Sequence, residues 1–191
     1  MRRTFLILAA LVLVGGAVAA QTGSDSGTTS WSGTSTEIGS ITFHHLSSSD
    51  GESVSGSSQQ IGSLTFHSLH GSDGGSTSGS SQQIGSYTYH SLSGSDGESL
   101  SGTSMEIGPY TYHSLRGSEG RSVSGTSQRI GSFAFHNLTS DDGGSAAGTS
   151  QGIGSSTYHH FETREPSDAL DSYGYELPDL DSGFDLDLDD D

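Results

Sequence analysis

The sequence predicts an all-β fold of tandem repeats, with a β-solenoid or β-roll as the expected architecture. The first observation is a period of 23 residues, marked by six isoleucines that are each followed by glycine: Ile38, Ile61, Ile84, Ile107, Ile130 and Ile153. A fixed period carried through several copies indicates one small unit that is stacked or strung out along the chain. The second observation is that each copy holds a short alternation of apolar and polar residues, as in Leu64-Thr65-Phe66-His67, which is typical of a strand.

The repeat domain is expected over residues 33–161, and an antiparallel β-meander is the alternative architecture. In a solenoid each unit is one coil, and equivalent residues stack about 4.8 Å apart. In a meander each unit is a hairpin, and equivalent residues lie two strands apart, about 9.5 Å. The constant unit length favours the coil, because it keeps equivalent residues in continuous columns.

Each unit is expected to contain two strands and two turns. In the first strand Leu64 and Phe66 are expected to face the core, with Thr65 and His67 on the other face. Leu69 has the wrong parity for that core, so the strand is expected to end or bend there. The second strand candidate, 53–61, has its apolar residues at odd spacing and would need a bulge near Gly56. Asp-Gly and Ile-Gly-Ser supply the turns.

The two ends differ from the repeats. Residues 1–20 carry two arginines, an apolar run and then small residues, which predicts a secretory signal peptide. Residues 21–32 are expected to form a flexible leader rich in Gly, Ser and Thr. Residues 162–191 are expected to form a disordered acidic tail. These segments predict a secreted or cell-surface protein, with the periplasm as an alternative location.

The composition limits the classes of molecule that are expected to bind this protein. The chain has no cysteine and no lysine, and its formal net charge is −17. Without disulfides an exported domain depends on packing, backbone hydrogen bonds or bound ions. The acidity excludes nucleic acid and anionic membranes as expected partners, and no membrane contact is expected after the signal peptide is removed. Self-association is expected through open sheet edges at the ends of the stack.

Two columns of residues are candidate metal ligands, with calcium, zinc or copper as the ions considered and no other cofactor expected. Carboxylates in the turns are ligands for calcium, and imidazoles are ligands for zinc and copper. The histidines are placed on a solvated face, where mildly acidic pH would charge them. The candidate residues are Asp50, Asp73, Asp96, Glu119 and Asp142 in the turns, and His44, His67, His90, His113, His136 and His159 in the strands.

The sequence also bears on two other activities, ice binding and catalysis. A threonine column at Thr42, Thr65, Thr88, Thr111 and Thr157 suggests an ice-binding array, although Ala134 interrupts it. Catalysis finds no support, because the chain has no G-x-S-x-G elbow, phosphate-binding loop or H-E-x-x-H motif. Each candidate residue also recurs in every copy, which suits a structural column better than one active site. The chain is therefore expected not to be an enzyme.

The segment Gly79-Ser80-Ser81-Gln82-Gln83-Ile84-Gly85-Ser86-Tyr87-Thr88-Tyr89-His90 resembles short tandem repeats in small exported bacterial proteins, which carry segments like G-T-S-Q-x-I-G-N-x-T-Y-H-N. The resemblance covers residues 33–161 and implies export but no mechanism. A looser resemblance is to curli-type fibre subunits, whose units also contain two strands and two turns. The regular Gln/Asn ladder of curli is absent here, and the acidity opposes amyloid assembly.

These observations predict an exported, non-enzymatic structural or surface protein that serves in adhesion, in the matrix or in a fibre. The alternative is an extracellular module that binds divalent cations through the turn acids, the histidine column or the acidic tail. Ice binding is a lesser alternative.

Overall fold

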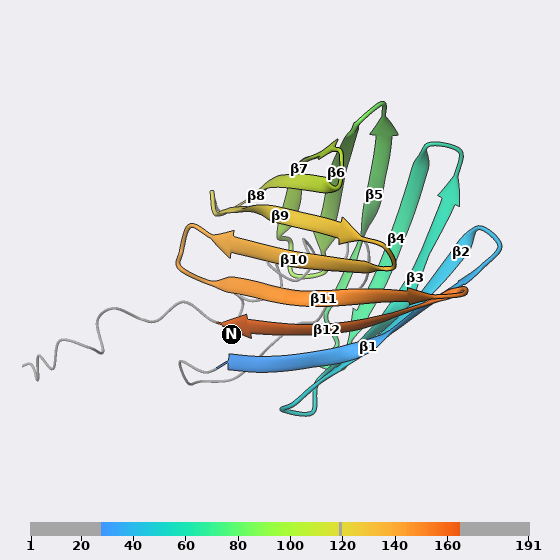
Figure 1. Ribbon diagram of the computed structural model, residues 1–191. Coiled ribbons are helices and arrows are strands. Elements are labelled where there is room, and N and C mark those ends of the chain that lie inside the picture. The colour runs from blue at the N-terminus through green and yellow to red at the C-terminus, as the bar shows by residue number, and fades with distance from the viewer. Residues whose placement is uncertain (1–27, 119, 165–191) are drawn as a thin grey trace, which may run out of the picture.

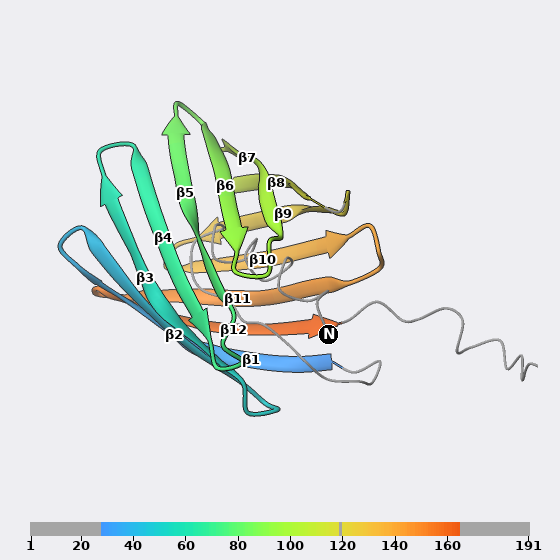
Figure 2. The same cartoon turned by 180° about the vertical axis from the view of Figure 1, so that it is seen from behind.

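The protein is a closed antiparallel β-barrel of twelve strands (Figure 1). The computed structural model describes residues 28–118 and 120–164. Neighbouring strands in the sequence are neighbours in the barrel, and β1 pairs with β12 to close it. Figure 2 shows the opposite side, where β2 to β6 form the near wall. In the described part of the chain, no helix has the length and apolarity needed to cross a membrane.

The strands are 8 to 11 residues long, and two of them come from each repeat. They are β1 (Thr28–Ile38), β2 (Ile41–Ser48), β3 (Ser53–Ile61), β4 (Leu64–Gly71), β5 (Ser76–Ile84), β6 (Tyr87–Gly94), β7 (Ser99–Ile107), β8 (Tyr110–Gly117), β9 (Ser122–Ile130), β10 (Phe133–Ser140), β11 (Ser145–Ile153) and β12 (Ser156–Arg164).

The all-β prediction is confirmed, but the expected β-solenoid is wrong. Each repeat is a hairpin in an antiparallel meander, as the alternative had it, and the meander closes into a barrel. The reason lies in the turns, which reverse the chain at both ends of every strand, so that consecutive strands pair antiparallel. Equivalent residues are consequently two strands apart, and the acidic turns are not stacked on one another.

The two kinds of turn define the two ends of the barrel. At one end Ile-Gly turns join strands through two residues, and Gly62, with φ +63°, represents the glycine that opens them. At the other end longer turns contain Asp-Gly or Glu-Gly, and Gly74, with φ +86°, represents their glycine. Positive φ values of this size favour glycine, which explains why both glycines recur with the repeat. These ends are called the Ile-Gly end and the acidic end below.

The face of each strand that points to the barrel interior is the opposite of the one predicted. Leu64 and Phe66, expected in the core, face outward, whereas Thr65 and His67 face the interior. Leu69, which shares their parity, is buried. The strand therefore neither ends nor bends at Leu69. No bulge occurs at Gly56 either, because β3 pairs with β4 without interruption and simply turns Val54 inward and Ile61 outward.

The hydrophobic core fills the acidic half of the barrel. It consists of one apolar side chain from nearly every strand: Trp31, Leu46, Val54, Leu69, Leu92, Leu100, Leu115, Val123, Leu138, Ala146 and Phe161. Glycines on the adjacent strands make room for the larger ones. Gly79, for example, lies beside Leu92, and a Cβ there would approach the Leu92 Cα to 2.7 Å and press against the carbonyl oxygen of Ser91. The same arrangement recurs at Gly56 beside Leu69 and at Gly102 beside Leu115.

The barrel is longer than the expected repeat domain at both ends. Residues 28–32, expected to belong to a flexible leader, form the start of β1, and Trp31 is only 1% exposed. At the other end β12 continues to Arg164, past the expected boundary at residue 161. The physical reason is barrel closure, since Thr28 to Ile38 supply the partner that β12 would otherwise lack. The expected signal peptide and most of the acidic tail lie outside the described residues.

The close packing at the repeated glycines predicts that Gly79→Ala destabilises the barrel. The added methyl would collide with the backbone of β6 and force the two strands apart. Overpacking of this kind costs about 1–3 kcal/mol, and backbone displacement can raise the cost. The free energy of unfolding from urea denaturation measures the effect.

The matched control is Ser78→Ala, one residue earlier on the exposed face of the same strand. A surface change of this type is expected to stay within about 0.5 kcal/mol. Equal stabilities for the two variants would contradict the proposed packing.

Candidate functional site

The barrel interior contains a closed ring of six histidines and six serines, called the His–Ser ring here. Twelve hydrogen bonds of 2.8 to 3.0 Å join a serine to a histidine, then that histidine to the next serine, around the whole circumference. The members, in ring order, are Ser35, His44, Ser58, His67, Ser81, His90, Ser104, His113, Ser127, His136, Ser150 and His159.

The sequence spacing explains the ring. Each ring histidine meets through Nδ1 a serine 9 residues before it, and all except His159 meet through Nε2 a serine 14 residues after them. These two spacings sum to the repeat length, so the pattern returns on itself in every unit. The final bond joins His159 Nε2 on β12 to Ser35 Oγ on β1 at 3.0 Å, and it exists only because the barrel closes.

Every hydrogen-bonding atom of a neutral ring is satisfied. A neutral imidazole offers one donor and one acceptor, and a serine hydroxyl can offer the same. Twelve hydrogens therefore serve twelve bonds, provided that all donors point in the same direction around the barrel and all six histidines share one tautomer. A protonated imidazole donates from both nitrogens, so it would break this order.

Burial keeps the ring histidines neutral. It lowers the pKa of each from the ordinary 6.5 to about 4, because the charged form loses its hydration. A neighbouring ring histidine lowers the pKa further in four of them, and Arg129 does so for His136. The expected solvated histidine face, charged at mildly acidic pH, is therefore wrong for these six residues. His45, His70 and His160 are the histidines exposed on the outer wall.

A polar cavity of about 400 Å³ lies between the His–Ser ring and the Ile-Gly end. Ring residues form part of its lining, and threonine, glutamine and glutamate side chains form the rest, among them Thr42, Thr65, Thr88, Thr157, Gln60 and Glu37. Threonines of the column considered for ice binding thus face a cavity inside the barrel. They do not form the flat outer array of hydroxyl and methyl groups on which that hypothesis depended.

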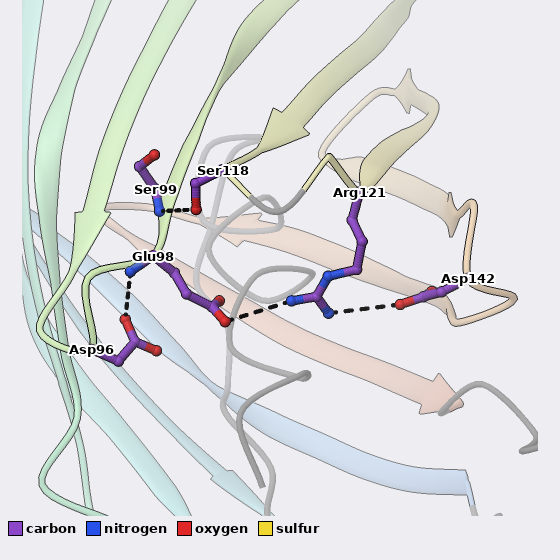
Figure 3. Close-up of polar contacts among 6 residues, drawn as sticks. All are labelled: Asp96, Glu98, Ser99, Ser118, Arg121 and Asp142. Carbon is purple, nitrogen blue, oxygen red and sulfur yellow. Dashed lines mark hydrogen bonds and ion pairs between the residues drawn. The ribbon is translucent and has the colours of Figure 1, made fainter.

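The acidic end carries an ion-pair cluster (Figure 3). Arg121 lies between two carboxylates, with Nη2 at 3.6 Å from Glu98 Oε1 and Nη1 at 3.7 Å from Asp142 Oδ2. The three residues come from three successive hairpin connections, so the guanidinium links turns that are far apart in the sequence. Asp96 accepts a hydrogen bond of 3.0 Å from the Glu98 amide, which orders the turn that presents Glu98.

The turn acids considered as metal ligands lie in separate turns around this end. Asp73 and Asp142 each accept a hydrogen bond from a backbone amide in their own turn, that of Gly75 and that of Gly144. Asp50 accepts one from the Ser48 hydroxyl, and Glu119 lies outside the described residues. Among those described, no three His, Cys, Asp or Glu side chains gather as a metal site would require. Metal binding by the two columns stays a prediction.

The outer wall near the Ile-Gly end carries a band of large apolar side chains, which is called the collar. Glutamine, serine and threonine side chains lie between them on alternate strands. The collar consists of fifteen large side chains that are 40 to 64% exposed. They are Ile38, Ile61, Ile84, Ile107, Ile130 and Ile153 beside the turns, and Phe43, Phe66, Tyr87, Tyr89, Tyr110, Tyr112, Phe133, Phe135 and Tyr158 on the following strands. The sequence predicts both columns but places both in the core, the isoleucine column by means of a bulge near Gly56; both are exposed instead.

The serines of the ring were missed altogether. Their signal was present, since Ser35, Ser58, Ser81, Ser104, Ser127 and Ser150 recur at the repeat period. These six serines could not be distinguished in the sequence, because serine also recurs at many other positions of the repeat.

No family model and no curated protein matches this chain. What the His–Ser ring and the collar do must therefore follow from their own geometry and chemistry.

The lowered pKa values predict that acid unfolds the barrel. In the unfolded chain the six histidines titrate near 6.5, so between pH 6.5 and 4 the unfolded state binds more protons than the native state. The ring's contribution to stability is complete above pH 6.5 and is lost as the pH falls towards 4. Each histidine contributes up to about 1.4 kcal/mol per pH unit in this range. Thermal melting at pH 7.5, 6.5, 5.5 and 4.5 measures the loss.

The control for this titration is a variant in which His45, His70 and His160, all exposed, are changed to Gln. It is expected to keep the same dependence of melting temperature on pH. A wild-type melting temperature that does not change between pH 7.5 and 5 would contradict the neutral ring.

Opening the ring at one serine is predicted to destabilise the protein. Ser81→Ala removes the partner of His67 Nε2 and of His90 Nδ1, at 2.9 Å each. Leaving a buried polar group without a partner costs about 1–3 kcal/mol. Urea denaturation measures the change, and Ser78→Ala on the outer face of the same strand is the control. A Ser81→Ala protein as stable as that control would show that the closed ring is not needed.

Proposed function

We propose that this chain is an exported, non-enzymatic surface protein that attaches through the collar to an apolar surface outside the cell. The collar is the observation that carries the proposal. Soluble monomers rarely expose large apolar patches, whereas here fifteen large apolar side chains are exposed around the wall of the barrel, with Gln, Ser and Thr side chains between them. Such a surface is expected to have a partner.

The closed barrel argues for attachment by the wall and against attachment by strand addition. Since β1 pairs with β12, the described strands have no free edge to which another strand could add. A fibre built through open sheet edges therefore has no support from this fold. The collar, in contrast, is accessible on every repeat.

The interior supports a non-enzymatic role. Its polar side chains at the level of the His–Ser ring are bonded to one another in the same way in all six repeats. A general base or nucleophile needs a lone pair or proton directed at a substrate. In the ring, both nitrogens of every imidazole are occupied by serine.

The distribution of charge supports an oriented protein. The turns at the acidic end carry Asp50, Asp73, Asp96 and Asp142, while the collar itself contains no charged side chain. The acidic end is thus strongly hydrated and the collar weakly hydrated. A surface-attached barrel would keep the first in water and place the second against its partner.

The test is adsorption of the exported protein to beads coated with octyl chains. The collar variant combines Ile61→Ser, Ile84→Ser and Ile107→Ser, which change side chains that are 54 to 58% exposed. It is expected to bind roughly tenfold less than the wild type, because the apolar area that the beads can cover is reduced. Circular dichroism and melting temperature establish that the variant is folded.

The control, called the wall variant, combines Ser55→Ala, Ser78→Ala and Ser101→Ala, which lie exposed on the same three strands nearer the acidic end. It is expected to bind like the wild type. Equal adsorption of the collar variant and the wall variant would refute attachment through the collar, and recovery of the protein from the cytoplasmic fraction of its host would refute export.

A further inference from the structure

We propose that the partner of the collar is an electrically neutral lipid bilayer, into which the Ile-Gly end of the barrel dips without crossing it. The inference rests on the proposed function, because it names the surface to which the collar attaches. Three features of the collar carry it: its circular course, its lack of charge and its height.

The circular course requires a partner that surrounds the barrel. Collar residues lie on the outer wall of all six repeats, from Ile38 on β1 to Tyr158 on β12, and β1 and β12 are neighbours. The wall of a closed barrel is convex (Figures 1 and 2). A second copy of the same barrel could touch such a wall only along one side. A fluid lipid layer can cover it on every side at once.

The lack of charge extends to the residues that face the collar across the strands. The cross-strand partners of Ile41, Leu64, Tyr87, Tyr110 and Phe133 are Gln59, Gln82, Met105, Gln128 and Gln151. The partners of Phe43, Phe66, Tyr89, Tyr112 and Phe135 are Ser57, Ser80, Thr103, Thr126 and Thr149. A charged side chain in the acyl region of a bilayer is costly, and this part of the wall contains none.

The height of the collar fits insertion into one leaflet. On β4 the outward residues Leu64 and Phe66 are apolar, and the next outward residues, Ser68 and His70, are polar. With about 3.3 Å per residue, the apolar stretch on β4 is roughly 7–10 Å high. On the neighbouring strands β3 and β5 only the terminal isoleucine is apolar on the outer face. A spanning barrel needs an apolar band about 25 Å tall, whereas interfacial elements sink about 5–10 Å into the headgroup and acyl boundary. The collar matches the second case.

The aromatic residues and the cavity agree with this placement. The five tyrosines of the collar have apolar rings and polar hydroxyls, which suit the boundary between acyl chains and headgroups. They are Tyr87, Tyr89, Tyr110, Tyr112 and Tyr158. The lumen at the same end is lined by threonine, glutamine, serine and Glu37, and Glu106 and Arg129 occupy the position of Gln60 on β7 and β9. Acyl chains therefore contact the outer wall and the turns, while the polar cavity receives water or headgroups.

The negative charge of the protein favours binding to neutral lipids over binding to anionic lipids. The chain is acidic overall, and at the mouth of the cavity Glu37 and Glu106 outnumber Arg129, so anionic headgroups would be repelled there. The inference departs from the expectation of no membrane contact after export. That expectation came from net charge, and net charge does not describe an outer wall on which the charged residues are absent.

The first experiment is flotation of the exported protein with phosphatidylcholine vesicles. The wild type and the wall variant are expected to float with the vesicles, and the collar variant to float at least ~10-fold less. Vesicles that contain phosphatidylglycerol are expected to bind less protein than pure phosphatidylcholine, since the protein is acidic. All three proteins have the same termini, so any difference between them comes from the barrel.

The second experiment measures depth with phosphatidylcholine brominated on its acyl chains. Tryptophan fluorescence in Phe66→Trp is expected to be quenched at least ~2-fold more than in Ser55→Trp, because only the first side chain lies in the collar. Trp31, buried in the core of both proteins, gives the same background in each. Equal quenching in the two variants would overturn insertion at the Ile-Gly end.

The outcomes separate this inference from the proposed function. Binding to octyl beads that depends on the collar, together with no flotation, overturns the bilayer and leaves collar attachment standing. Failure to bind either material overturns both. A stable dimer in which the collar is buried, or flotation only with anionic vesicles, also overturns the inference.

Discussion

The other features of this barrel follow from the closure of the His–Ser ring. A barrel interior that contains six imidazoles and six hydroxyls would be costly to bury if any of them lacked a partner. The cost is avoided because each group bonds to the next and the last bonds to the first, through His159 and Ser35. Register, strand number and tautomer are thus coupled, since a change in one of them leaves a buried polar group unsatisfied.

This polar ring divides the barrel into two halves, which differ in whether apolar or polar side chains point inward. On the acidic side of the ring, leucine, valine and aromatic side chains point inward and form the core. On the Ile-Gly side, threonine, glutamine, serine and Glu37 point inward, and the large apolar side chains point outward. A short strand can do both because its inward positions change from polar to apolar along its length, as Thr65, His67 and Leu69 do on β4. The collar is therefore the outer counterpart of the polar interior.

The charges are arranged along the same axis. The meander places equivalent turns two strands apart, which reduces the repulsion between their carboxylates compared with stacked coils. Arg121 further offsets it by lying between Glu98 and Asp142. One end of the barrel is then hydrated and acidic and the other is uncharged on its outer wall, so the molecule has a direction. We infer that this difference between the two ends orients the protein at a surface.

The repeat unit can be predicted from the order of the amino acids alone: its 23-residue length, its two strands, its two glycine turns and the columns of residues that recur in it. These follow from local chemistry, because alternation makes strands and glycine allows positive φ. Which face of each strand lies inside becomes evident only in the folded barrel. The alternation of apolar and polar residues is the same whichever face is buried. By hydrophobicity alone Phe66 is the better candidate for the core, and the burial of His67 is explained only by its hydrogen bonds to two serines. Those serines come from neighbouring repeats, and the last of them from β1, so the bonds that reverse the faces exist only when the chain has closed on itself.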